Sequence, residues 1–132
     1  MGRRVIFDTT FLIDYERGRI DRSKLDSDDI AVAAISIAEY RTGIELADNE
    51  ERATERARAL TAIIKTVEVL LYSDETARYH AQLIAHTRRT GQRRGAHDLI
   101  LAAHAVQTGR ILLSNDAAAR FGSLPGVTTG SS

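Results

Sequence analysis

The stretch Val5-Ile6-Phe7-Asp8, close to the start of the chain, holds the strongest structural signal in the sequence. Three consecutive apolar residues between polar ones predict a short strand buried on both faces. An acidic residue directly after such a strand lies at its carboxyl end. In parallel sheets flanked by helices, ligands bind beyond the carboxyl ends of the strands. The stretch therefore predicts a parallel sheet and gives Asp8 a functional position.

Outward from this strand, short apolar runs alternate with stretches of helical periodicity. Further strands are expected at residues 30–34, 67–71, 111–113 and around 127, and helices at 11–17, 36–47, 50–66, 74–89, 98–108 and 117–121. The helix at 74–89 is expected to have Ser73 as its N-cap and to end near Gly91. This alternation predicts an α/β fold, a three-layer α/β/α sandwich with a mostly parallel central sheet. The 132 residues fit one domain, 1–132, whose tail 129–132 is expected to be disordered.

The composition is that of an ordinary globular domain, with 43% apolar and 27% charged residues. The chain has no cysteine, which excludes disulfides and thiolate chemistry. Its longest apolar run, 99–103, is far shorter than the roughly 20 residues of a membrane-spanning helix. The first residues lack the apolar core of a signal peptide. These features predict a soluble, cytoplasmic protein with no membrane contact.

Formal net charge is zero, so bulk basicity gives no indication of nucleic-acid binding. The positive charge is nevertheless unevenly spread, because four arginines cluster in one short segment: Arg88, Arg89, Arg93 and Arg94. A planar guanidinium can donate two hydrogen bonds to one phosphate, which makes these residues candidates for phosphate contacts. The alternative interpretation is a solvated helix end and loop.

Four acidic residues are candidates for chemistry, and each also has a structural explanation. Asp8, Asp98 and Asp116 could cap the helices expected after them. Glu39 closes the segment Ser-Ile-Ala-Glu (36–39), which matches a capping box. Against that, Glu39 lies off the apolar stripe of its helix, and Gly43 follows one turn later, where it would leave room for a close approach. Taken singly, the acids are explained by capping as well as by catalysis.

Their order along the chain is more informative than any one of them. Four blocks occur in sequence: VIFDTT (5–10), SIAEYRTGI (36–44), HDLILAAHAVQTG (97–109) and ILLSND (111–116). The chain resembles the PIN-domain family and, within it, the VapC toxins of bacterial toxin–antitoxin pairs. The resemblance implies an Mg²⁺-dependent endoribonuclease, with Mn²⁺ as a substitute. It also implies the catalytic and metal-binding residues: Asp8, Glu39, Asp98 and Asp116.

The same resemblance assigns supporting roles and partners. Thr9, Ser114 and Asn115 would hold the carboxylates by hydrogen bonds, and the arginine cluster would bind the RNA backbone. A VapB-like antitoxin and a homodimer are implied as partners. Many relatives carry a further acid two residues after the last motif aspartate, where this chain has Ala118, so the number of metal ions stays open.

Other protein classes fit less well. A dehalogenase-type phosphatase needs an aspartate at position 10, where Thr10 stands, and a receiver domain needs an acidic neighbour of Asp8. The four histidines show no chelating spacing and are expected to be packing or surface residues. Two alternatives remain open: a PIN-like module that binds RNA or protein without cleaving, and a PIN nuclease that is not a toxin.

Overall fold

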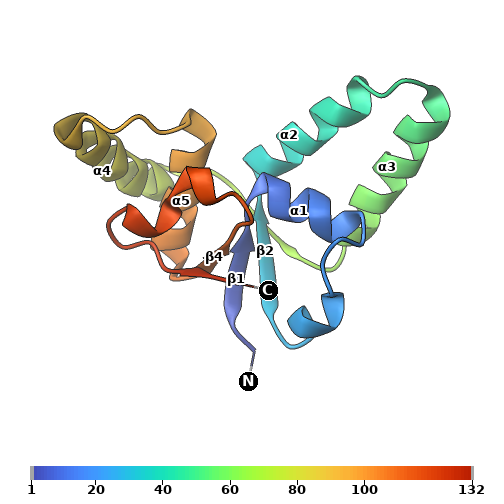
Figure 1. Cartoon of the computed structure of the whole chain (residues 1–132), viewed down its shortest axis with the longest axis horizontal. Helices are drawn as coiled ribbons and strands as arrows, with labels where there is room; N and C mark the ends of the chain where they lie inside the picture. The colour runs from blue at the N-terminus through green and yellow to red at the C-terminus, as the bar shows by residue number, and fades with distance from the viewer. Residues whose placement is uncertain (1, 132) are drawn as a thin grey trace.

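Strand β1 (Arg4–Phe7) lies at the centre of a five-stranded sheet in the computed structural model, which describes residues 2–131 (Figure 1). The other strands are β2 (Asp29–Ala33), β3 (Glu68–Leu70), β4 (Ile111–Leu113) and β5 (Thr129–Gly130). Their order is β3-β2-β1-β4-β5, and every pairing is parallel. The predicted α/β fold is therefore confirmed, with a sheet that is entirely parallel.

Helices connect the strands and cover both faces of the sheet. They are α1 (Thr9–Glu16), α2 (Ala34–Glu45), α3 (Glu50–Ile64), α4 (Asp74–Thr90) and α5 (Ala96–Thr108), with short 3₁₀ helices η1 (Arg22–Leu25), η2 (Ala117–Ala119) and η3 (Phe121–Ser123). Among residues 2–131, none of the helices is both long enough and apolar enough to cross a bilayer.

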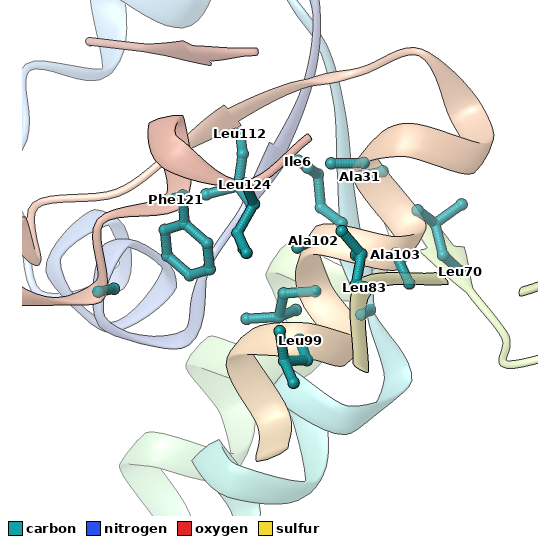
Figure 2. Close-up of a cluster of buried hydrophobic side chains, with 14 residues drawn as sticks. Ile6, Ala31, Leu70, Leu83, Leu99, Ala102, Ala103, Leu112, Phe121 and Leu124 are labelled. Carbon is teal, nitrogen blue, oxygen red and sulfur yellow. The ribbon is translucent and has the colours of Figure 1, made fainter. Parts of the chain in front are cut away.

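Alternation along β1 divides the core into two clusters. Ile6 faces α4 and α5, and Figure 2 shows it near Leu83 and Ala102 of those helices. Val5 and Phe7 belong to the other cluster, with side chains of α1, α2 and α3. All three strand residues are fully buried, because successive side chains of a strand point to opposite faces and both faces are covered. The predicted three layers follow directly from this arrangement.

The ends of α4 follow the local signals in the sequence. Ser73 accepts a hydrogen bond from the backbone N–H of Thr76, whose hydroxyl in turn accepts one from the Ser73 N–H. Gly91 ends the helix at φ 68°, a left-handed conformation that glycine adopts without steric cost. Both residues were expected to delimit this helix.

The start of α2 differs from the expectation. The helix begins at Ala34, directly after β2, with Ala33 as its N-cap. Ser36 is therefore buried inside the first turn, and the capping-box interpretation of residues 36–39 is wrong. The chain passes from strand to helix without a loop, so no polar N-cap side chain is used.

The end of the chain is also more ordered than expected. The strand expected around residue 127 lies at Thr129–Gly130, where it pairs with β4. The Arg3 guanidinium donates a hydrogen bond of 2.8 Å to the Ser131 carbonyl. The expectation of a disordered tail is wrong at residues 129 and 130, because parallel pairing satisfies their backbone; Ser132 lies outside the described residues.

At the amino-terminal ends of the strands, one buried arginine joins four of them. Arg110 precedes β4, and its side chain is only 1% exposed. It donates to the carbonyls of Val5 in β1 and Asp29 in β2, at 3.1 and 2.9 Å, and to the Asp29 carboxylate at 3.1 Å. A further bond of 2.7 Å reaches the carboxylate of Glu68 in β3. These contacts fix the amino-terminal ends of β1, β2, β3 and β4 relative to one another.

We expect Arg110→Met to lower the free energy of unfolding by about 3 kcal/mol, because it leaves the Val5 and Asp29 carbonyls at the strand ends without their donor. Urea denaturation followed by circular dichroism measures the change. Glu68→Gln is the matched control: its carboxylate is 59% exposed, so its loss should cost less than about 1 kcal/mol. Equal effects of the two substitutions would contradict a central role for Arg110.

Candidate active site

The four candidate acids come from four separate segments, at the carboxyl-terminal side of the sheet. Asp8 follows β1 directly, and Asp116 lies three residues beyond β4. Glu39 is in α2, and Asp98 is the third residue of α5. The charges of the other three acids all act on Asp98, as described below. The fold thus places the four carboxylates within electrostatic reach of one another.

Asp8 is the most deeply buried of the four and the most heavily hydrogen-bonded. Its carboxylate accepts from the Phe11 backbone N–H at 2.8 Å, as an N-cap of α1, and from the Thr10 hydroxyl at 3.2 Å. The Ser114 hydroxyl donates to its other oxygen. Burial raises the pKa of Asp8 even though these hydrogen bonds lower it. Asp8 is therefore the N-cap of α1 and also a carboxylate whose charged form is disfavoured by burial.

Ser114 links Asp8 to Asp116. Its oxygen donates to Asp8 and accepts the backbone N–H of Asp116 at 3.0 Å. The Asp116 carboxylate accepts from the Ala118 N–H at 3.0 Å, which makes it the N-cap of η2. The segment after β4 therefore brings the Ser114 hydroxyl to the Asp8 carboxylate and ties Asp116 to it.

Glu39 is held by two side chains from other segments. Its Oε1 accepts a hydrogen bond of 2.7 Å from the Thr9 hydroxyl, and its Oε2 lies 3.3 Å from Nδ1 of His97. The role expected for Thr9 agrees with this contact. His97 was expected to be a packing or surface residue; although half exposed, it contacts a candidate acid. Its position beside Asp98 in the sequence was the available signal.

Asp98 is not a helix cap. Gly95 is the N-cap of α5 and Asp98 lies within the first turn, with no hydrogen bond to its carboxylate found among residues 2–131. A Cβ at position 95 would lie 3.2 Å from Oδ2 of Asp98, so the glycine leaves room for the carboxylate. Burial is the main cause that raises the pKa of Asp98, followed by the charges of Asp116, Asp8 and Glu39. The capping alternative is wrong for this residue.

Several expected contacts are made elsewhere. Asn115 donates to the carboxylate of Asp14, at 3.3 Å, and not to one of the four acids. Arg94 donates to the carbonyls of Ala119 and Arg120 and to the Ser123 hydroxyl. Its guanidinium is thus engaged within the protein, which is a correction to its expected role in phosphate contact.

Thr10, which binds Asp8, was given no role from the sequence. Its hydroxyl, two residues after the aspartate, was the available signal.

The remaining arginines of the cluster are on the surface. Arg88 and Arg89 are exposed in the last turn of α4, and Arg93 is exposed in the segment before α5. No hydrogen bond or ion pair from these three side chains is found within the part of the chain that the structure describes. Their geometry leaves them free for phosphate contacts and equally fits a solvated helix end.

The chemistry of the four acids fits a hard divalent cation. Carboxylate oxygens are the ligands that Mg²⁺ and Mn²⁺ prefer. Burial raises the pKa of Asp8 and of Asp98, and the charges of neighbouring acids raise both further. Within residues 2–131 no three acidic or histidine side chains are already close enough to hold a metal ion.

Comparisons with known proteins identify the family. Residues 5–122 match the PIN domain. The chain is 29% identical over 111 residues to Ribonuclease VapC5 of Mycobacterium tuberculosis (strain ATCC 25618 / H37Rv), covering 84% of this chain and 82% of that protein.

Solved structures show the same fold. VapBC2 from Rickettsia felis bound to a promoter DNA fragment gives a TM-score of 0.85 at 19% identity, covering 98% of each chain. DNA-bound VapBC from Salmonella typhimurium gives 0.83 at 23% identity, covering 99% of this chain and 98% of that one. The match to the PIN domain extends over all four acids and nearly the whole sheet. The chain belongs to the PIN-domain family.

Proposed function

We propose that the protein is a metal-dependent endoribonuclease, the toxin of a VapBC-type toxin–antitoxin pair. The observation that carries this proposal is the placement of four acids from four separate segments at one end of the sheet, where the charges of three of them act on Asp98. A fold that gathers acidic groups against their mutual repulsion requires a compensating role for them. The likeness to Ribonuclease VapC5 supports RNA as the substrate.

In this proposal Asp8 and Asp98 are the principal metal ligands, and Glu39 and Asp116 complete the set. The ion would be Mg²⁺, with Mn²⁺ as a substitute, because all donors are carboxylate oxygens. When bound, such an ion lowers the pKa of a water molecule and neutralises the charge that develops on the phosphate.

The surrounding residues position the acids. Ser114 binds one oxygen of Asp8, the Phe11 N–H at the start of α1 binds the other, and the Thr10 hydroxyl lies 3.2 Å from both, which restricts the orientation of the Asp8 carboxylate. Thr9 orients Glu39, which is left to accept a proton from the attacking water. These contacts hold the reacting groups in place before substrate binds, which reduces the entropy lost in the transition state.

The proposal includes partners. Two of the structural neighbours are VapBC complexes, which supports a VapB-like antitoxin for this chain, and a homodimer is proposed with it. Leu46, Leu71 and Tyr72 are large exposed apolar residues that supply surface for contacts between chains. A nuclease that acts on cellular RNA in this way would work in the cytoplasm.

We expect Asp98→Asn to lower RNA cleavage by about three orders of magnitude or more, because it removes a principal metal ligand. Cleavage of a fluorescent single-stranded RNA in Mg²⁺, with and without a chelator, measures the loss. Asp48→Asn is the matched control, since Asp48 is 81% exposed and pairs with Arg52. Full activity of Asp98→Asn, or of the unmodified protein in excess chelator, would sink the proposed mechanism.

Asp98→Asn should also stabilise the metal-free protein at neutral pH, raising Tm by roughly 3 °C. The pKa of Asp98 is higher in the folded protein than in the unfolded chain, so the folded protein holds this proton more tightly. The free energy of unfolding therefore falls as pH increases from about 4 through the pKa of the folded protein. The variant should therefore lose less stability than the unmodified protein as pH increases across this range. Thermal denaturation at several pH values measures both effects.

The same denaturation series contains its own check. Mg²⁺ should raise Tm of the unmodified protein and have little effect on Asp98→Asn, because the ion binds only the complete carboxylate set. If Asp98→Asn were less stable than the unmodified protein at neutral pH, the charged Asp98 would stabilise the fold, contrary to this expectation.

Ser114→Ala should lower metal affinity or activity by about 10- to 100-fold, since it removes the hydroxyl that links Asp8 to Asp116. The Mg²⁺ concentration required for half-maximal cleavage is the quantity to measure. Ser114→Thr keeps the hydroxyl and should retain most of the activity. If the alanine variant needed no more Mg²⁺ than the unmodified protein, the link would have no part in metal binding.

A further inference from the structure

A hollow of about 250 Å³ lies beside the carboxylates, on the side of β4 and β5. Its lining includes Asn115, Asp116, Arg120, Gly122 and Thr129. Asp116 belongs both to this hollow and to the candidate metal site, so the two spaces adjoin. The volume exceeds that of several water molecules, at about 30 Å³ each. None of the roles assigned so far uses this space.

Arg120 has an unusual backbone at the edge of the hollow. Its φ is 46°, and it is the one non-glycine residue with positive φ in the part of the chain that the structure describes. The left-handed region is disfavoured for residues with a Cβ, and such residues persist where the surroundings impose them, often at functional sites. Arg120 separates η2 from η3 and is flanked by two buried residues, Ala119 and Phe121.

Arg94 binds the backbone at this position. Its guanidinium donates to the Arg120 carbonyl at 2.7 Å and also to the carbonyl of Ala119 and the hydroxyl of Ser123. These bonds join the segment before α5 to the segment that contains Arg120.

The Arg120 side chain itself is free. The residue is exposed, and no hydrogen bond or ion pair from its guanidinium is found between residues 2 and 131. Arg120 lines the hollow together with Asp116, so its guanidinium can meet a ligand that enters the hollow from solvent.

We propose that Arg120 binds a backbone phosphate of the RNA, next to the one that is cleaved, while the hollow admits part of the adjoining nucleotide. The proposal rests on the proposed ribonuclease function. Four carboxylates repel a polyanion, so binding needs a cation close to the site, and a guanidinium matches a phosphate with two parallel hydrogen bonds. Arg94, predicted from the sequence to contact RNA, instead holds the backbone that presents Arg120.

The test is RNA binding by Arg120→Asn in the Asp98→Asn background, which does not cleave. Asparagine adopts the left-handed region more readily than most residues, so the backbone is retained while the charge is lost. Fluorescence anisotropy of a short single-stranded RNA over a range of salt concentrations gives the affinity. We expect the slope of log K against log salt to become shallower by about 0.7, the value for one phosphate contact on a single strand.

Two further variants separate charge from shape. Arg58→Gln removes an exposed positive charge on α3 and should leave both slope and affinity unchanged. Gly122→Leu adds a side chain on the wall of the hollow, since a Cβ there would already lie 3.4 Å from the Thr129 hydroxyl. It should weaken RNA binding at every salt concentration with no change in slope, because no charge is altered.

The cleavage assay distinguishes failure of this inference from failure of the proposed function. With Asp98 intact, Arg120→Asn should raise KM and leave kcat nearly unchanged. If the unmodified protein cleaves RNA and Arg120→Asn keeps the original KM and salt slope, the assignment of Arg120 is wrong and the nuclease stands. If the unmodified protein does not cleave RNA, the proposed function fails, and the role of Arg120 fails with it.

Discussion

In the parallel pairing of β1 with β4, Phe7 lies opposite Leu113, and the Asp8 N–H donates to the Leu113 carbonyl at 3.1 Å. Asp8 and Ser114 therefore leave the sheet at the same level and can bond to each other. A shift of the register by one residue would turn Phe7 to the wrong face and separate Asp8 from Ser114. The link from Asp8 through Ser114 to Asp116 depends on this alignment.

The two ends of the sheet have opposite electrostatic character. At the amino-terminal end, a buried cation is compensated by carbonyls and carboxylates from three strands. At the carboxyl-terminal end, Asp8 and Asp98 are partly desolvated beside other acids, which raises the pKa of both. The Arg110 contacts thus stabilise the fold at the amino-terminal end of the sheet, whereas the buried acids destabilise it at the carboxyl-terminal end. Such a loss of stability is common where a site binds a ligand that balances its charge.

Local patterns in the sequence predicted what depends on neighbours along the chain. The apolar run 5–7 indicated a central strand, and Ser73 and Gly91 indicated the ends of α4, because strand burial and helix capping act over a few residues. The contact of His97 with Glu39, the Arg94 bonds and the Arg110 network join residues far apart in sequence, and no periodicity encodes them. The capping box at 36–39 failed because β2 continues directly into α2.

Strand β5 has only two residues, yet it covers one side of β4, whose sequence Ile-Leu-Leu is wholly apolar. An apolar strand at an open sheet edge is a template for pairing with other chains. Gly130 fits there because a Cβ would lie only 2.8 Å from the Ile111 side chain. Residues 129 and 130 therefore protect β4 from pairing with other chains. Deleting them, or replacing Gly130 by a bulky residue, would lower solubility without altering the four acids.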